Sequence, residues 1–386
     1  MKAKDFIDPK VGKAIRTQAG YWAFVPAQLP PQGIRCAQLS AVLSDAGHDL
    51  KMFASLSSDH PLSRQLRKPF MRSEAVHSSR IEGIHVSLVD LYNYESAGPS
   101  SHDDGSQVIE VFNNVRALEH GLDRLNEFPV SLRLIRELHA KLMENGRGGN
   151  SASGKFRATQ NWIGPAGCTL MDATYVPPPV EEMLTALNAL ENFIHTEPDL
   201  PALVRVGMIH YQFEAIHPFL DGNGRVGRML SMLLLSEWEL LPYPPLNLSA
   251  YFERHQQEYY DRLLAVSQRG EWEEWLSFFL KGVSVQAQDG MKRMNTLQGM
   301  REKYGATMRA DRNPARMTVV INFLFAHPIT THRQIADGLN IPFEITGQYL
   351  EKLIAAGILK ETSGSAHERM FQADEILQAV EGPEQA

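Results

Sequence analysis

Cysteine is almost absent from this chain of 386 residues, which contains only Cys36 and Cys168. Two cysteines cannot build a disulfide framework or a cysteine-rich metal cluster, and this scarcity is typical of proteins in a reducing compartment. Long apolar runs are missing too, since MLLL at 232–235 is far shorter than a membrane span and the N-terminal MKAKDFIDPK has no apolar signal core. We therefore expect a cytoplasmic protein without a membrane segment.

An excess of positive charge is also missing. The chain has 38 Lys and Arg residues against 45 Asp and Glu residues, which gives a net charge of -7. This balance argues against a general binder of nucleic acid or of anionic membranes. The length exceeds what one compact core usually supports, so we expect two or three domains.

Helical periodicity is the dominant pattern, and few segments read as strands. The first thirty-odd residues are proline-rich and extended, and apolar residues at helical spacing begin near Ile34. Residues 95–107 form a polar connector that includes the acidic stretch SHDDG. Residues 154–179 combine β-branched and aromatic residues with Gly-Pro turns, which predicts a small β-hairpin in an otherwise all-α core.

One short stretch, HPFLDGNGRVGR at 217–228, has the features of an anion site. An apolar helix ends near His217, which precedes a proline, and another begins near Gly224. Free N–H groups and the positive end of the helix dipole lie at such a helix start. Arg225 and Arg228 are each unfavourable there by about 0.3 to 1 kcal/mol, so a bound polyphosphate explains their presence.

Two further residues of this stretch suit phosphate chemistry. Asp221 stands where a divalent cation that bridges phosphates needs a carboxylate. His217 stands beside the helix start and is the obvious general base. His210, seven residues earlier, has no third metal ligand at suitable spacing, so we interpret it as a residue of the core or the helix surface.

The stretch resembles the signature of Fic domain proteins, HPFx(D/E)GNGRxxR, at every fixed position. The segments FRATQNWIG upstream and NLSAYFERHQQEYYDRLL downstream are also similar to that family. The resemblance implies an all-α, Fic-type helical core with a small β-hairpin flap. It predicts an N-terminal region over 1–106, a catalytic core over 107–300 with its flap at about 154–179, and a separate module over 310–386.

The resemblance implies that the protein transfers AMP from ATP to a Ser, Thr or Tyr hydroxyl of a target protein, with Mg²⁺. By motif position, His217 takes the proton of the target hydroxyl and Asp221 holds the Mg²⁺ ion. The flap presents the target. The residues that the resemblance assigns to ATP binding are Glu82, His217, Gly222, Asn223, Gly224, Arg225, Val226, Gly227, Arg228 and Tyr260.

A second stretch, SSRIEG, resembles the inhibitory motif (S/T)xxxE(G/N) of Fic proteins and is matched by Ser78, Glu82 and Gly83. We expect it to end a helix over about 69–83 that starts at Pro69 and stops at Gly83. A glutamate in the last turn opposes the helix dipole, so something else must favour it. The resemblance implies that Glu82 pairs with Arg228 and obstructs the γ-phosphate of ATP.

The last module, 310–386, has three helical patterns followed by two strand-like stretches, an order that resembles a winged helix-turn-helix domain. It has six Lys or Arg residues against ten Asp or Glu residues, so DNA binding is weakly supported and partner recognition or homodimer formation is favoured. Two alternative functions stay open. One is removal of AMP at the same site, with Glu82 positioning water, and the other is a nucleotide-sensing, DNA-binding regulator.

Overall fold

The computed structural model describes residues 1–97, 105–144, 152–241, 246–362 and 369–382, and these residues are mostly helical. Two short 3₁₀ helices are present, η1 (Ala3–Asp5) and η2 (Cys36–Leu39). The N-terminal α-helices are α1 (Ser40–Asp59), α2 (Ser63–Ile81), α3 (Leu88–Ala97), α4 (Gly105–Arg124) and α5 (Leu132–Leu142). The central ones are α6 (Val180–His195), α7 (Ala202–Ile216), α8 (Asn223–Glu237), α9 (Leu248–Arg254), α10 (Gln256–Arg269) and α11 (Trp272–Thr307).

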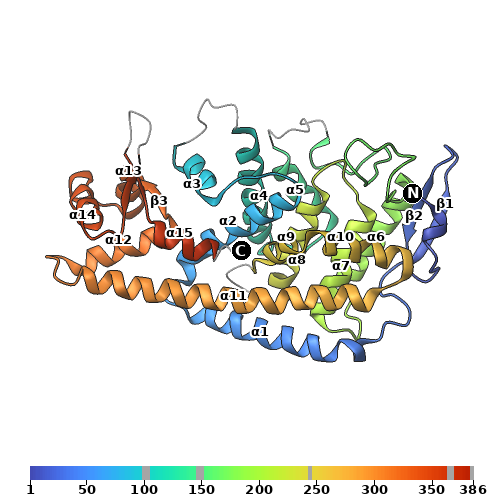
Figure 1. Cartoon of the computed structure of the whole chain (residues 1–386), viewed down its shortest axis with the longest axis horizontal. Coiled ribbons are helices and arrows are strands. Elements are labelled where there is room, and N and C mark those ends of the chain that lie inside the picture. Colours follow the sequence, from blue (N-terminus) through green and yellow to red (C-terminus); the bar gives the residue numbers. More distant parts are fainter. Residues whose placement is uncertain (98–104, 145–151, 242–245, 363–368, 383–386) are drawn as a thin grey trace.

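Helix α11 is the scaffold of the molecule and runs along its length with α1 beside it (Figure 1). Helix α7 packs against α11 in the centre, where the indole N–H of Trp275 donates to the carbonyl of Gly207 at 2.9 Å. Helices α7 and α8 are buried on nearly every side, as expected for helices that are apolar around their whole circumference. This burial fixes the turn between them, which contains HPFLDGNGRVGR.

The extended N-terminal segment pairs with itself, which the sequence analysis did not anticipate. Strands β1 (Gly12–Arg16) and β2 (Trp22–Pro26) form an antiparallel ribbon in which Gly12 lies opposite Pro26. The N–H of Phe24 donates to the carbonyl of Val176 at 2.9 Å. The ribbon therefore supports the far end of the flap segment.

The flap, 154–179, differs from the expected two-stranded hairpin. Its single antiparallel bridge joins Ile163 to Tyr175, with N–H to carbonyl distances of 2.8 and 3.0 Å, and the segment forms no longer ladder. The Tyr175 hydroxyl donates instead to the carbonyl of Ala215 on α7 at 2.8 Å. The flap is thus a loop with one backbone bridge, and its C-terminal end is also bound to α7 and β2.

Helix α2 starts earlier than the sequence analysis predicted. Pro69 lies inside this helix rather than at its first position, while Gly83, at φ 76°, follows its end as predicted. An interior proline costs about 3 kcal/mol or more. Leu62, Leu66 and Phe70, spaced four residues apart, are all fully buried, and burial of each such side chain contributes roughly 1.5 to 3 kcal/mol. The apolar spacing therefore outweighs the proline.

The C-terminal segment contains α12 (Pro314–Ala326), α13 (His332–Leu339), α14 (Phe343–Ala355) and α15 (Asp374–Glu381). Strands β3 (Ile329–Thr331), β4 (Lys360–Thr362) and β5 (Met370–Gln372) form a sheet in the order β3-β5-β4. These elements pack against α2, α3 and α11 at one end of the molecule (Figure 1). Their assignment to a winged helix-turn-helix domain stays a prediction.

Two smaller expectations can be placed on the structure. Residues 101–104 of the SHDDG stretch lie outside the described residues, and Gly105 begins α4. Among the helices of the described segments, none combines the length and the apolar character that a membrane crossing requires.

The pairing of α1 with α11 predicts opposite effects for two glycines of α11. A Cβ atom on Gly290 would lie 2.7 Å from the buried ring of Phe53, whereas one on Gly299 would meet open space. Both replacements by alanine gain about 1 kcal/mol of helix propensity. We expect Gly299→Ala to raise the free energy of unfolding by up to about 1 kcal/mol. In Gly290→Ala, the clash with Phe53 should cost about 1 to 3 kcal/mol, which is offset in part by the gain in helix propensity, so the free energy of unfolding should fall. Urea denaturation of both variants checks this, and equal effects would contradict the packing.

Candidate active site

His217 occupies the turn between α7 and α8. It is the C-cap of α7 and adopts a left-handed conformation, with φ 48° and ψ 62°. Its own N–H donates to the carbonyl of Phe213 at 3.0 Å. Left-handed backbone is uncommon for a residue other than glycine and requires support from the surroundings. It turns the chain sharply, so that the imidazole stands beside the start of α8.

The flap segment supplies that support. The carbonyl of His217 accepts hydrogen bonds from Nε of Arg157 at 3.0 Å and from Nδ2 of Asn161 at 3.2 Å. Arg157 also donates to the carbonyls of Thr159 and Pro178, and Asn161 donates to the carbonyl of Phe219 at 2.7 Å. Both side chains are buried. The sequence does not reveal this supporting role of Arg157 and Asn161, because the carbonyls of His217 and Phe219 lie more than fifty residues away in the chain.

Asn223 closes the loop of the motif. Its Oδ1 accepts from the N–H of Phe219 at 2.8 Å, and its Nδ2 donates to the carbonyl of the same residue at 2.8 Å. The buried amide is therefore engaged in shaping the loop. Because both amide atoms are engaged, the backbone N–H of Asn223 is the group left to contact a phosphate, and the assignment of Asn223 to ATP binding stays a prediction.

His139 on α5 is a second support that the sequence did not reveal. Its ring stacks on that of Phe219 with centroids 3.8 Å apart. The N–H of Gly154 donates to Nδ1 of His139 at 3.0 Å, so Nε2 carries the proton and donates to the carbonyl of Asp221 at 3.1 Å. Burial lowers the pKa of His139 to about 4, so the ring is neutral. It positions the loop without a charge.

The start of α8 is arranged as an anion site. Gly222 is the N-cap of this helix, with φ 77°, and the next three N–H groups have no partner within the helix. A Cβ atom on Gly224 would lie 2.2 Å from Oε1 of Glu82 and 2.9 Å from Nη1 of Arg228. That Nη1 is buried and has no hydrogen-bond partner among the described residues. The space beside Gly224 is thus surrounded by hydrogen-bond donors and is occupied by the carboxylate of Glu82.

Glu82 and Arg228 form the ion pair that the resemblance predicted. Oε1 of Glu82 lies 2.7 Å from Nη2 of Arg228. Ser78 contributes twice, because its hydroxyl accepts from Nε of Arg228 at 2.9 Å and its carbonyl accepts from Nη2 at 2.8 Å. Burial alone would lower the pKa of Arg228, but Glu82 and other nearby groups hold it above its usual value. Ser78, Glu82 and Arg228, predicted from distant parts of the sequence, lie together.

The two arginines of the motif face different neighbours. Arg225 is buried and its Nη1 lies 3.3 Å from Oε2 of Glu110 on α4, while its Nη2 lies 3.6 Å from Oδ1 of Asp221. Arg228 reaches α2 instead. Residues three apart in a helix lie on neighbouring parts of its surface, yet these two side chains turn toward different helices. In the structure each guanidinium is neutralised by its own carboxylate.

Two motif residues lie away from the anion site. Val226 is fully buried in the core. A Cβ atom on Gly227 would lie 2.2 Å from Oε1 of Glu214, so this glycine permits α8 to pack closely on α7. Close helix packing, rather than approach of a phosphate to the backbone, therefore explains Gly227. Burial raises the pKa of Glu214 to about 8, so this carboxyl is neutral at pH 7.

His217 is in the state that a general base requires. Burial lowers its pKa to about 4, although the ring is only partly buried. Its Nδ1 lies 3.3 Å from the carbonyl of Glu214, which can only accept, so Nδ1 carries the proton. The other nitrogen, Nε2, then holds a free lone pair at neutral pH.

Asp221 is an exposed carboxylate at the rim of the site and suits a metal. Its side chain is 62% exposed, and Oδ1 accepts from the N–H of Gly222 at 2.6 Å. No cluster of three or more His, Cys, Asp or Glu side chains that could hold a metal ion occurs in the described part of the chain. A single carboxylate fits Mg²⁺ that is bound mainly by phosphates and water, since Mg²⁺ retains most of its water ligands.

Tyr260 lies next to the inhibitory segment, residues 78–83. Its ring is 41% exposed, and its hydroxyl donates to the carbonyl of Ile81 at 3.1 Å. His210 proves to be a core residue, as interpreted from the sequence. It is fully buried, with Nε2 2.8 Å from the hydroxyl of Tyr259 and Nδ1 2.9 Å from that of Ser231.

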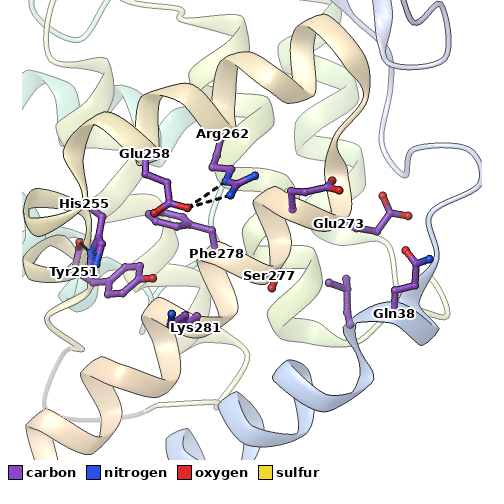
Figure 2. Close-up of a pocket in the computed structure, with 11 residues that line it drawn as sticks. Gln38, Tyr251, His255, Glu258, Arg262, Glu273, Ser277, Phe278 and Lys281 are labelled. Atoms are coloured by element: carbon purple, nitrogen blue, oxygen red, sulfur yellow. Dashed lines mark hydrogen bonds and ion pairs between the residues drawn. The ribbon is translucent and has the colours of Figure 1, made fainter.

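A second hollow, of about 390 Å³, lies between α10, α11 and η2 (Figure 2). Its lining mixes both charges, and Arg262 pairs with Glu258 at 3.1 Å. No residue of the motif lines it. Its charges are largely balanced by one another, so we do not assign it to a nucleotide.

Comparison with known proteins agrees with this site. The sequence profile described as Fic/DOC family matches residues 129–235, and the one described as Fic/DOC family N-terminal matches residues 40–123. A protein adenylyltransferase Fic from Culex quinquefasciatus is 27% identical over 233 residues, which is 58% of this chain and 43% of that protein. The protein adenylyltransferase fic-1 of Caenorhabditis briggsae is 27% identical over 257 residues, 65% of this chain and 47% of that protein. The chain thus spans less than half the length of these relatives.

Solved structures share the fold. A Fic family protein from Desulfovibrio desulfuricans G20 aligns with a TM-score of 0.59 at 18% identity, over 89% of this chain and 98% of that one. Fic-1 from C. elegans aligns with a TM-score of 0.52 at 20% identity, over 68% of this chain and 75% of that one. The motif, its geometry, the two family profiles and these folds agree. The chain therefore contains a Fic domain of the Fic/DOC family over residues 129–235, preceded by the N-terminal region of that family over residues 40–123.

Proposed function

We propose that this protein is a protein adenylyltransferase, which transfers AMP from ATP to a hydroxyl side chain of a target protein. The observation that carries the proposal is that the neutral imidazole of His217 lies beside the start of α8. At this helix start, the Arg228 guanidinium and free backbone N–H groups lie close to Gly224. The relatives named protein adenylyltransferase Fic support the same activity.

The reaction follows from these positions. Nε2 of His217 takes the proton from the target hydroxyl as its oxygen attacks the α-phosphorus of ATP. The bond between that phosphorus and the bridging oxygen breaks, and pyrophosphate leaves. The N–H groups of residues 223–225 and the Arg225 and Arg228 guanidinium groups stabilise charge on the phosphates. Mg²⁺ held by Asp221, when bound, neutralises phosphate charge.

We propose that Glu82 keeps this site inactive until it is displaced. Its carboxylate lies against Gly224 and on Arg228, both of which a polyphosphate would need. A carboxylate and a phosphate cannot occupy that space together, and their like charges repel. We infer that ATP is seated productively only when Glu82 leaves Arg228.

The flap is proposed to hold the target. Trp162 and Met171 on the flap are 43% and 68% exposed, and Leu220 in the motif is 54% exposed. Trp162 and Leu220 each follow a member of the hydrogen-bonded pair Asn161 and Phe219, so both lie close to the turn that carries His217. Exposed apolar side chains of this size are typical of contact surfaces. We also propose that residues 310–386 form a winged helix module that recognises a protein partner.

Replacement of the two central residues tests the activity. Glu82→Gly frees Arg228 and should raise AMP transfer about 10- to 100-fold, which corresponds to one charge-assisted hydrogen bond. His217→Ala in the Glu82→Gly background should lower it by about 10² to 10⁴, the contribution of a general base. Transfer from α-labelled ATP to proteins of a cell lysate measures both. Glu258→Gly, at an exposed carboxylate on α10, is the control and should change neither rate. No labelled protein with Glu82→Gly, despite normal ATP binding, would refute the proposal.

The protonation state of His217 predicts the pH profile. Its pKa is lowered to about 4 by burial, and Glu82 raises it somewhat, so removal of Glu82 lowers it further. The ring is then a free base above about pH 5. The rate of AMP transfer by Glu82→Gly should stay level from pH 8 to about pH 5.5 and fall only below that, as His217 gains a proton. A decline centred near 6.5 would mean that the imidazole has its ordinary pKa. Circular dichroism across the range checks that the fold persists.

Replacement of the exposed part of the flap tests target docking. Residues 168–174 exchanged for a Gly/Ser linker of equal length leave Tyr175 and its bridge to Ile163 in place. In the Glu82→Gly background, we expect normal ATP binding by calorimetry but at least a tenfold loss of AMP transfer to the target, because binding energy that orients the hydroxyl is removed. Unchanged transfer would mean that the target docks elsewhere.

A further inference from the structure

The end of α2 is capped by its own backbone and by side chains of another helix. The carbonyls in the last turn of a helix lack partners within the helix. Here the N–H groups of Glu82 and Ile84 return to the carbonyl of Ser79 at 3.0 and 3.1 Å, and that of Gly83 returns to Arg80 at 2.9 Å. The turn therefore satisfies two of these carbonyls with its own backbone.

The carbonyl of Ile81 is satisfied by side chains of another helix. Nε2 of Gln256 donates to it at 2.7 Å, and the hydroxyl of Tyr260 donates to it at 3.1 Å. Gln256 is the first residue of α10 and Tyr260 follows four residues later, so both side chains project from the same side of that helix. Burial raises the pKa of Tyr260 to about 12, and its hydroxyl thus keeps the proton that it donates.

That carbonyl belongs to the peptide group that joins Ile81 to Glu82. Because the peptide group is planar, holding its oxygen also fixes its nitrogen and the direction in which the next Cα follows. The helix does not continue past Glu82, because Gly83 adopts the left-handed conformation. Gln256 and Tyr260 therefore hold the peptide group that directly precedes Glu82, whose carboxylate lies on Arg228.

We propose that Gln256, together with Tyr260, is a positioning residue that holds the inhibitory segment, residues 78–83, in its blocking place. Within the described residues, Gln256 makes no hydrogen bond to the motif or to Glu82, so it acts on AMP transfer through the Ile81 carbonyl. The consequence for AMP transfer rests on the proposed function. The consequence for the end of α2 does not, because it concerns the free protein alone.

Gln256→Leu removes the donor with the shorter hydrogen bond and leaves an apolar side chain that ends one atom earlier. Gln257→Leu is the matched control, because the neighbouring Gln257 is exposed and its Nε2 donates to Oδ1 of Asp261 within α10. Both variants lose one glutamine amide at the start of the same helix. A general loosening of α10 would therefore appear in both variants, whereas loss of the contact to α2 would appear in Gln256→Leu alone.

Amide hydrogen exchange of the full chain without nucleotide is the first measurement. We expect faster exchange at Glu82, Gly83 and Ile84 in Gln256→Leu, by roughly two- to tenfold, which is the effect of one lost hydrogen bond. Gln257→Leu should exchange at these amides like the unmodified chain. Equal exchange in all three proteins would overturn the proposal, whatever the activity of the protein.

AMP transfer from α-labelled ATP is the second measurement. Gln256→Leu should raise it about two- to tenfold, below the rise with Glu82→Gly, and should add nothing in the Glu82→Gly background. An equal rise in both backgrounds would overturn the proposal, since Gln256 would then act on the site directly. No AMP transfer by Glu82→Gly would defeat the proposed function, and hydrogen exchange alone would then decide the role of Gln256.

Discussion

The ion pair between Glu82 and Arg228 is the interaction on which the arrangement of the site depends. Glu82 ends α2, where an anion is unfavourable by up to about 1 kcal/mol, but its carboxylate lies at the start of α8, where an anion is favourable by a similar amount. The charge-assisted hydrogen bond to Arg228 adds about 1.5 to 3 kcal/mol. The carboxylate therefore belongs electrostatically to α8 rather than to its own helix.

Because Arg228 is buried, another anion must take the place of the Glu82 carboxylate when the ion pair breaks. Its side chain is almost completely buried, and a buried guanidinium without an anion is costly. Glu214, another carboxyl close to this arginine, is kept neutral by burial and offers no substitute charge at pH 7. A polyphosphate can take the place of the Glu82 carboxylate, because it supplies the negative charge that this end of α8 requires.

The catalytic turn is held in a different way, by hydrogen bonds between side chains and the backbone rather than by an ion pair. Arg157 and Asn161 fix the carbonyl of His217, Asn223 closes the loop, and His139 supports it from α5. All of these contacts leave the imidazole nitrogen Nε2 free. The site thus has two parts. The turn with His217 is held rigidly, whereas the Glu82 carboxylate occupies the phosphate position and can be replaced.

The sequence by itself determined the local features: the two helices around the motif, the stop at Gly83 and the residues that the family signature fixes. It placed Ser78, Glu82 and Arg228 in one site only through the resemblance. Tertiary structure alone decided that Gly227 contacts α7, that Arg225 pairs with Glu110 and that α2 continues through Pro69. The physical reason is that capping and turn preferences act within a few residues, whereas burial and ion pairing depend on neighbours that the chain reaches only after it folds.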